Sequence, residues 1–228
     1  MATTEYTFNL RNLQANPVTM WLFLEAPQFS TPPQNVFQNS DTFLQVTPYD
    51  PTRTQKFESF VQYSMGVGAQ TDPVVVGNVA KSSQTISAEL NKGYLATYGS
   101  SQGDAPGIVP GKTRATPTET NLVVDTNVFS PVQNWNNSMT FGVKTSSGST
   151  GVTWVPNPNF EYVITPILTF FVAVGNYSVN KLAQIQAGSL TNAVLKTGPG
   201  GDFDQFNNTY ITYEQDGTWS TQKTPWSV

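Results

Sequence analysis

Apolar and polar residues alternate in several stretches with a period of two, the period of a β-strand with one buried face. Between Glu5 and Leu10 every second residue is apolar. The longest alternation runs from Phe57 to Val67 and ends among glycines. Val18 to Leu24 is apolar at nearly every position, which is typical of a central strand with both faces covered. These patterns predict three strands.

Shorter apolar stretches predict further strands. We expect them at residues 42–47, 74–76, 85–90, 120–129, 139–144, 152–154, 162–174, 209–214 and 218–220. The stretch Ala26 to Asn39 is predicted to be a loop, since the prolines 32 and 33 exclude a helix. Helical spacing occurs at Ser178 to Ala187, where Ser178 would be the N-cap. The prediction is an all-β protein: an antiparallel β-sandwich, jelly-roll-like, with about a dozen short strands and at most one short helix.

The chain length fits one domain, because β-sandwiches of about 200–250 residues commonly fold as a single unit. The stretch from Thr97 to Glu119 has several glycines and prolines and few large apolar side chains. It is therefore predicted to be a long flexible loop. We expect a single β-sandwich domain over residues 1–228, with a join between two subdomains at this loop as the alternative.

The composition narrows the chemistry. The chain has no histidine and no cysteine, the residues that supply most general bases, thiolate nucleophiles and zinc ligands. Paired carboxylates could still hydrolyse glycosides, but the sequence does not show whether any of Glu25, Glu58, Glu89 and Glu161 converge. A phosphate-binding loop is excluded at Gly107 to Thr113, since its glycines are one residue too close. We therefore expect a protein that is not an enzyme.

The low content of charged residues limits the partners that the protein can bind. Charged residues make up 11% of the chain, where soluble domains average about 25%, and no Lys/Arg cluster occurs to bind nucleic acid. The polar residues after Met1 and the absence of a run of about 18 apolar residues predict neither a signal peptide nor a transmembrane segment. A cytoplasmic or non-classically released protein is the expectation, although the compartment itself is left open.

Two groups of residues are candidate ligand sites. Four tryptophans lie near polar residues, where an indole could stack on a sugar while amides bind its hydroxyls. The candidate glycan-binding residues are Trp135, Asn136, Asn137, Trp154 and Trp219. The alternative is that these tryptophans close the core or lie in subunit interfaces.

The second candidate site is a cation site. Asp202 and Asp204 lie in a glycine-rich turn, and Asp216 follows downstream. Calcium binds oxygen ligands of this kind, but the EF-hand pattern is not matched. The alternative is that each carboxylate closes a local Asx-turn. We expect no cofactor, with calcium as the open exception.

The two ends of the chain are candidates for assembly. Tyr6 and Phe8 lie in a strand that could pair with a second copy, and Trp226 lies near the C-terminal end. A surface of few charges lowers the repulsion between identical subunits. The leading hypothesis is thus a non-catalytic, self-associating structural or surface-binding protein that forms a homo-oligomer. One alternative is a lectin-like module for neutral glycans. The other is a membrane-active toxin or defence protein that inserts a β-hairpin, with the Phe57 to Val67 strand and the Thr97 to Glu119 loop as possible parts.

Overall fold

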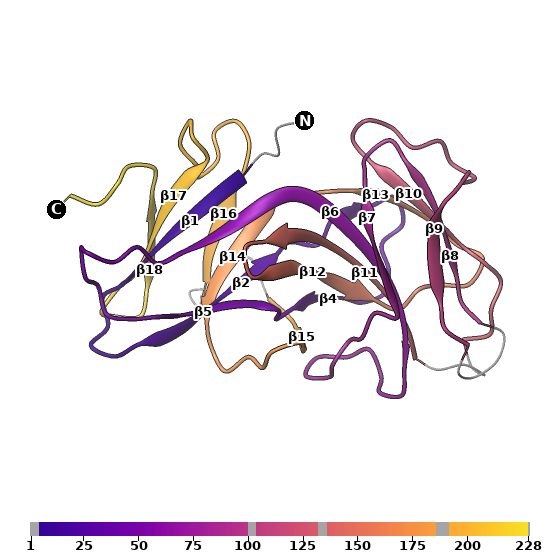
Figure 1. Ribbon diagram of the computed structural model, residues 1–228, viewed down its shortest axis with the longest axis horizontal. Helices are drawn as coiled ribbons and strands as arrows, with labels where there is room; N and C mark the ends of the chain where they lie inside the picture. Colours follow the sequence, from indigo (N-terminus) through magenta and orange to yellow (C-terminus); the bar gives the residue numbers. More distant parts are fainter. Residues whose placement is uncertain (1–4, 100–103, 132–135, 186–191, 228) are drawn as a thin grey trace.

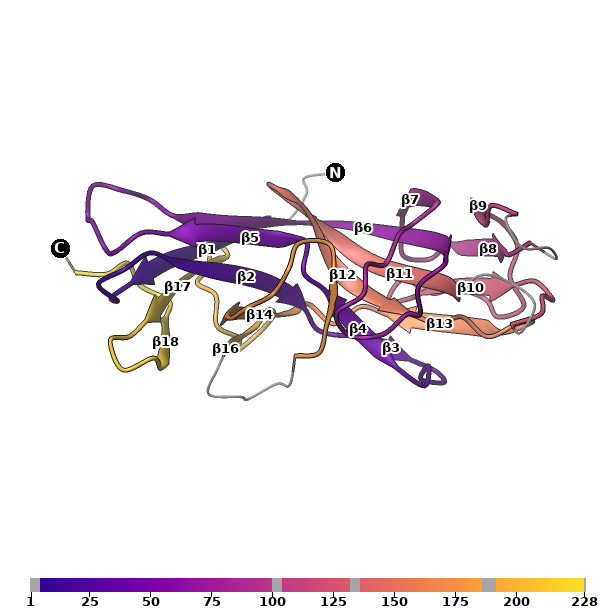
Figure 2. The ribbon, with the colours of Figure 1, turned by 90° about the horizontal axis from the view of Figure 1, so that it is seen from below.

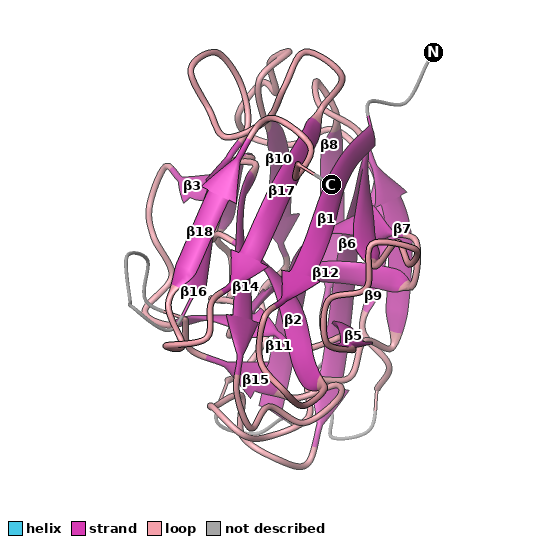
Figure 3. Ribbon diagram, turned by 90° about the vertical axis from the view of Figure 1, so that its left-hand side faces the viewer, coloured by secondary structure: helices cyan, strands magenta, loops and turns pink. Residues whose placement is uncertain are grey.

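The protein is built of β-strands. The computed structural model describes residues 5–99, 104–131, 136–185 and 192–227. Those ranges contain 18 strands in three mostly antiparallel sheets and no helix (Figure 3). The prediction of an all-β sandwich is confirmed, with more strands than the sequence indicated.

The largest sheet has nine strands and forms one layer of the sandwich. In spatial order its strands are β15 (Leu182–Ala183), β4 (Val36–Asn39), β12 (Gly148–Trp154), β11 (Asn136–Thr145), β6 (Lys56–Gln70), β1 (Glu5–Asn12), β17 (Asn208–Tyr213) and β18 (Trp219–Gln222), with β7 (Gln84–Ala88) also paired to β6. Figures 1 and 2 show β6 running along the long axis of the molecule.

Two smaller sheets pack against the nine-stranded sheet. The four-stranded sheet contains β16 (Asn192–Lys196), β14 (Thr169–Val174), β2 (Val18–Leu24) and β5 (Thr42–Val46). The five-stranded sheet contains β3 (Gln28–Phe29), β13 (Glu161–Thr165), β10 (Leu122–Thr126), β8 (Gly93–Thr97) and β9 (Gly107–Pro110). Strands β14 and β2 lie toward one end of the molecule, and β8, β9 and β10 toward the other (Figures 1 and 2). Two neighbouring pairs, β1–β17 and β8–β10, are parallel.

One cluster of buried side chains draws on all three sheets. Phe8 in β1 meets Phe170 in β14 edge to face, with ring centroids 5.0 Å apart. At the other end Trp154 in β12 meets Phe29 at 5.1 Å and Tyr162 at 5.8 Å. Aromatic pairs thus join the nine-stranded sheet to each smaller sheet. This shared core supports the single-domain reading, which stays a prediction.

Strand β2 is buried on both faces, as its apolar sequence predicts. Leu22 points into the main core, whereas Trp21 and Phe23 point to the opposite face of the four-stranded sheet. There the ring of Tyr177 covers them at 5.8 and 5.0 Å. Tyr177 belongs to the connection between β14 and β15, which therefore closes the outer face of this sheet.

That connection is where the predicted helix is wrong. Asn180 has a φ of 60°, and residues 182 and 183 form the short strand β15 against β4. Leu182 and Ala183 pack into different apolar clusters, as successive residues of a strand do. Since an isolated short helix is marginal in water, pairing with β4 decides the conformation. Residues 186 and 187 lie outside the described residues.

Other boundaries also differ from the prediction. Residues 74–76 form a turn before Gly77 rather than a strand. Pro166 interrupts the stretch predicted as one strand, so that β13 and β14 belong to different sheets. The predicted loop 26–39 contains β3 and β4, and the predicted loop 97–119 contains β9. Strand pairing across the sandwich imposes these short strands where local sequence gives little sign of them.

Candidate functional site

The predicted glycan-binding residues do not form one surface. Trp154 is fully buried in β12, and Trp219 packs against the main core from β18. Asn137 is buried in β11, whereas Asn136 is exposed and donates its side-chain amide to the Thr71 carbonyl. Trp135 lies outside the described residues. The predicted ligand role of Trp154 does not fit its position, because a fully buried indole offers no face to a sugar.

Each of the three candidate calcium ligands accepts hydrogen bonds within its own turn instead of converging with the others on one point. The Asp202 carboxylate accepts the backbone N–H of Lys196 at 2.8 Å. Asp204 accepts the N–H groups two and four residues further on, at 2.8 and 2.7 Å. Asp216 accepts the N–H and hydroxyl of Thr218, which hold the pKa of this carboxyl below its usual range. Asp204 and Asp216 match the Asx-turn alternative, whereas Asp202 closes its turn from the other side by bonding to Lys196. No metal-binding group of three His, Cys, Asp or Glu occurs in the described part of the chain.

Calcium is accordingly expected to leave the stability of the protein unchanged. A cation that binds only the folded state raises the melting temperature, so equal melting temperatures in millimolar calcium and in EDTA are the predicted result. Differential scanning fluorimetry measures both, with magnesium as the control for ionic strength. A rise with calcium that magnesium does not reproduce would contradict the turn-closing role of Asp202, Asp204 and Asp216.

The predicted assembly residues divide between the core and the surface. Phe8 is fully buried, and Tyr6 packs edge to face on Phe203 at 5.0 Å. Both lie in β1, which is paired on one side with β6 and on the other with β17. The buried Phe8 ring is not placed to contact a second copy, so its predicted assembly role does not fit its position. Tyr6 is partly buried, and its assembly role stays a prediction. Trp226 is different, because it lies half-exposed over the outer face of the sheet.

Trp226 forms a rigid aromatic group with residues from three other segments. Its ring lies 6.2 Å from that of Tyr49 and 5.3 Å from that of Tyr210, in both cases edge to face. Its indole N–H donates to the Thr212 hydroxyl oxygen at 3.1 Å. The Arg11 guanidinium lies over the rings of Tyr49 and Trp226, at 5.4 and 5.0 Å, and also donates to Thr212 at 3.1 Å. These contacts fix the position of the Trp226 indole.

Strand register explains why these groups meet. Asn9 is paired with Tyr210 and Arg11 with Thr212 across the parallel strands β1 and β17. The residues between them point into the core, so all four of these side chains project from the outer face. Trp226 comes back over this face after β18, while Trp219 stays on the inner face. Trp219 and Trp226 therefore lie on opposite faces of the sheet.

Beside these rings lies a hollow, which we call the aromatic hollow, with a volume of about 210 Å³. It is lined by Asn9, Tyr49, Pro51, Arg53, Thr54, Gln55, Tyr210, Pro225 and Trp226. Aromatic rings, amides and hydroxyls thus surround one space. Arg53 is the single charged residue of this lining and is paired with Asp50 at 3.5 Å. The arrangement can stack on a flat apolar surface while hydrogen-bonding polar groups at its rim.

Sequence reasoning missed two of the three rings. Tyr210 could have been found, because the alternation around β17 puts it on the face opposite Ile211. Tyr49 gave no such signal, since it lies between two prolines in an irregular stretch. Trp226 was singled out, but as an assembly residue.

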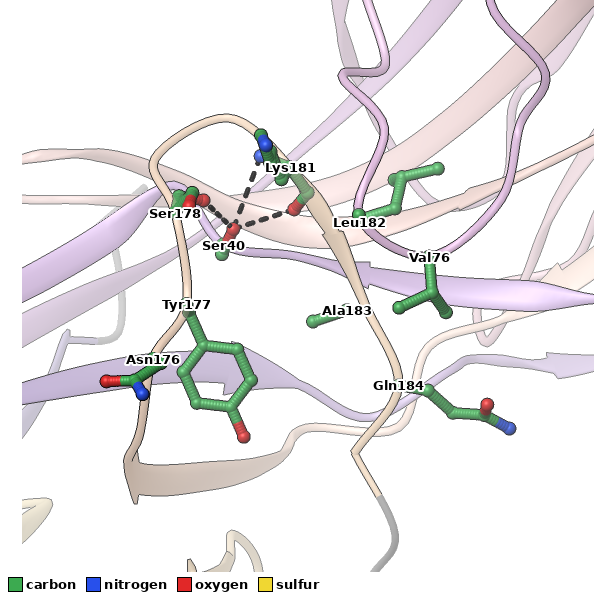
Figure 4. Close-up of a pocket in the computed structure, with 10 residues that line it drawn as sticks. Ser40, Val76, Asn176, Tyr177, Ser178, Lys181, Leu182, Ala183 and Gln184 are labelled. Atoms are coloured by element: carbon green, nitrogen blue, oxygen red, sulfur yellow. Dashed lines mark hydrogen bonds between the residues drawn. The ribbon is translucent and has the colours of Figure 1, made fainter.

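A larger hollow of about 330 Å³ lies between the β14–β15 connection and the turn at Val76. Figure 4 shows Tyr177 on one side of it, Ala183 and Val76 on the other, and Lys181 at its edge. The hydroxyl of Ser40 lies within hydrogen-bond distance of the carbonyls of Ser178 and Lys181 (Figure 4). This volume lies at the lower end of the range for small-molecule sites. Most of the lining residues are polar, and Tyr177 is the single aromatic ring among them.

Asp41 carries the strongest electrostatic perturbation near a hollow. It follows β4 and is partly buried, and desolvation raises the pKa of its carboxyl from the ordinary 3.8 to about 6, opposed in part by a hydrogen bond from Asn39. Because the folded protein holds this proton more tightly than the unfolded chain, its contribution to stability is greatest below pH 3.8. That contribution falls as the pH rises toward about 6 and stays low above it.

The variant Asp41→Asn should remove this dependence. The free energy of unfolding of the wild type, relative to that of the variant, is expected to fall between pH 3.8 and about 6 and to be constant at higher pH. Urea unfolding at a series of pH values measures it. Asp50→Asn, a change in an exposed turn, serves as the control. A wild-type advantage that grows over the same pH range would contradict the desolvation of Asp41.

Comparison with known proteins gives no family: no family model, no curated protein and no solved structure matches this chain.

Proposed function

We propose that this protein is a non-catalytic carbohydrate-binding protein that holds a neutral glycan in the aromatic hollow. The observation that carries the proposal is the convergence of Trp226, Tyr49 and Tyr210 on one hollow whose rim also holds the amides of Asn9 and Gln55. Aromatic faces match the apolar faces of sugar rings, and amides match the hydroxyls at their edges. The larger hollow beside Tyr177 also has amides in its lining, but it offers one ring where the aromatic hollow offers three.

The rigidity of the aromatic group supports binding. Arg11 and Thr212 hold the indole in place before any ligand arrives, so little side-chain freedom remains to be lost on binding. The Gln55 amide is likewise held by Thr47, whose backbone N–H donates to it at 2.8 Å. A preformed site of this kind favours binding to a ligand of fixed shape.

The charge of the lining supports binding rather than hydrolysis. Glycosidases need two carboxyl groups on either side of the scissile bond. The residues that line the aromatic hollow include no Asp and no Glu. The low charge of the whole chain also suits an uncharged ligand, because no field selects for acidic or basic partners.

A glycan array probed with the labelled full chain tests the proposal. Neutral glycans are expected among the hits, and Phe206→Ala is expected to keep them, since Phe206 is 72% exposed and lies in a separate turn. Hits on acidic glycans alone, or a signal that survives loss of the Trp226 ring, would overturn the assignment to this hollow.

Self-association is the second candidate function, favoured by β18. This strand ends the nine-stranded sheet and is paired only with β17 in the described part of the chain (Figure 3). Its four residues, Trp219 to Gln222, carry no charge, whereas exposed edges are commonly protected by charged residues. Antiparallel pairing of β18 between two copies would extend the sheet and form a twofold dimer.

Thr221→Lys tests this pairing. Thr221 is exposed at the centre of β18, and a lysine there places two like charges opposite each other in the paired strands. The wild type is expected to grow in mass with concentration in light scattering, and the lysine variant to remain a monomer. Thr221→Ser is the matched control. A wild type that stays at 24.9 kDa at all concentrations would contradict self-association.

The membrane-active alternative has less support, because one of its two proposed parts lies inside the largest sheet. The Phe57 to Val67 stretch lies within β6, which pairs with β1, β7 and β11. Inserting this stretch into a bilayer would break the centre of the nine-stranded sheet. The described residues also contain no helix that could span a membrane.

A further inference from the structure

A third hollow, which we call the Asp41 hollow, lies on the outer face of the nine-stranded sheet and has a volume of about 110 Å³. Its floor is formed by β6, β11 and β12, and one wall is formed by the segment that leads into β7. The lining consists of Asn39, Asp41, Ser64, Gly66, Ala80, Ser82, Thr85, Thr140, Gly142, Ser149 and Gly151. The site is distinct from the aromatic hollow and does not depend on the proposed function.

Close backbone packing keeps the floor free of side chains. Gly142 and Gly151 lie directly opposite each other in β11 and β12. A Cβ atom on Gly151 would lie 2.4 Å from the Phe141 carbonyl oxygen, and one on Gly66 would lie 2.7 Å from the Ser82 hydroxyl. Larger residues are therefore excluded at these positions, and the space above the strands stays open.

A chain of hydrogen bonds orients the Asp41 carboxyl. The Thr140 and Thr153 hydroxyls are 2.9 Å apart, and Thr153 donates to the side-chain oxygen of Asn39 at 2.9 Å. With its oxygen accepting from Thr153, Asn39 has its amide N–H₂ group left to donate to Asp41, which is the hydrogen bond that lowers the pKa of this carboxyl. The Asp41 carboxyl thus lies in the wall of the hollow beside an amide that the threonines orient.

The lining has one negative charge and no positive charge. Asp41 is its single titratable residue, and the hydroxyls of Ser64, Ser82 and Thr85 are among the groups around it. Lys81 lies between two lining residues, but it is exposed and is not part of the lining. A carboxylate and several hydroxyls are acceptors that match the three N–H donors of an ammonium group.

A metal ion fits this lining less well. Calcium takes six to eight oxygen ligands, commonly several carboxylates, and no group of three acidic residues occurs here or elsewhere in the described ranges. One carboxylate balances one positive charge. The size of the hollow limits the ligand to a small molecule or to the end of a longer chain.

We propose that the Asp41 hollow binds a small primary amine in its protonated form, with the ammonium group donating to the Asp41 carboxylate and to the surrounding hydroxyls. The amine could be a free small molecule or the end of a longer amine-bearing ligand. The raised pKa of Asp41 agrees with this reading, because a partly buried carboxyl with no cation beside it is favoured in its neutral form.

Titration with methylammonium and with ethanolamine, followed by NMR on the full chain above pH 7, tests the proposal. Saturable shifts are expected for residues of the hollow, with none for tetramethylammonium, which has no N–H donor. Butylamine carries the same ammonium group on a longer chain, so binding of butylamine as well would assign the site to the end of a longer ligand. Shifts with sodium or calcium but with no amine would overturn the proposal.

Two variants assign the binding to this site. Asp41→Asn is expected to weaken amine binding by at least about tenfold, and Asp50→Asn, in an exposed turn, should leave it unchanged. Thr85→Val removes one hydroxyl from the hollow while keeping the shape of the side chain, so it is expected to weaken amine binding less than Asp41→Asn does. It tests the site independently if Asp41→Asn does not fold correctly. Saturating amine should also lower the pKa of Asp41 in the wild type. Unchanged affinity in both variants would overturn the proposal.

Discussion

Trp154→Ala is expected to lower the free energy of unfolding by about 3–5 kcal/mol, the usual cost of removing a fully buried large aromatic ring. The indole is completely inaccessible and contacts the rings of Phe29 and Tyr162, which belong to the five-stranded sheet. Its removal leaves a cavity where that sheet packs on the nine-stranded sheet. The effect should therefore be among the largest of any single substitution in the chain.

Urea unfolding followed by circular dichroism measures this loss. Phe206→Ala is the matched control, because it also removes an aromatic ring but from a position that is 72% exposed, and it should change stability by less than about 0.5 kcal/mol. Equal and small effects of the two substitutions would contradict the packing of Trp154 between the sheets. The indole would then be free to contact a ligand, as the sequence suggested.

Trp226→Ala is expected to weaken glycan binding by at least about 30-fold, or about 2 kcal/mol, as the loss of a central aromatic contact commonly does. Stability should change much less, because the ring is half-exposed and outside the main core. Isothermal titration calorimetry with a glycan found on the array measures the affinity. Thermal unfolding of the same preparation shows that the variant is folded.

Arg11→Lys gives a finer test of the same site. Lysine keeps the charge but lacks the planar guanidinium that lies over Tyr49 and Trp226 and donates to Thr212. A loss of binding smaller than that of Trp226→Ala is expected, since the indole remains but is less firmly held.

If Trp226→Ala binds glycan as tightly as the wild type, the aromatic hollow is not the glycan site.

Local alternation was enough to predict the class of fold. The strands with the clearest period, β1 and β6, and the doubly buried β2 lie close to their predicted positions. Short strands such as β3, β9 and β15 were missed, because they exist through pairing with distant partners rather than through their own sequence. The helical spacing near Ser178 was overridden in the same way.

The candidate sites were harder to predict from the sequence than the fold was. Trp154 and Trp226 each have a hydroxyl residue next to them in the sequence, yet one indole is in the core and the other is on the surface. The return of the chain after β18 brings Trp226 onto Tyr210, and the register of β1 with β17 places Arg11 beside them. Asp41 gave no signal, because its burial depends on three strands and a connecting segment that are far apart in the sequence.

The most direct test of the proposed function follows the indole N–H signal of Trp226 by NMR while neutral oligosaccharides from the array are added. Saturable shifts of that signal and of the backbone signals of Asn9, Tyr49 and Tyr210 are the predicted result. Binding that shifts only signals elsewhere, or no shift with any neutral glycan, would contradict carbohydrate binding at the aromatic hollow.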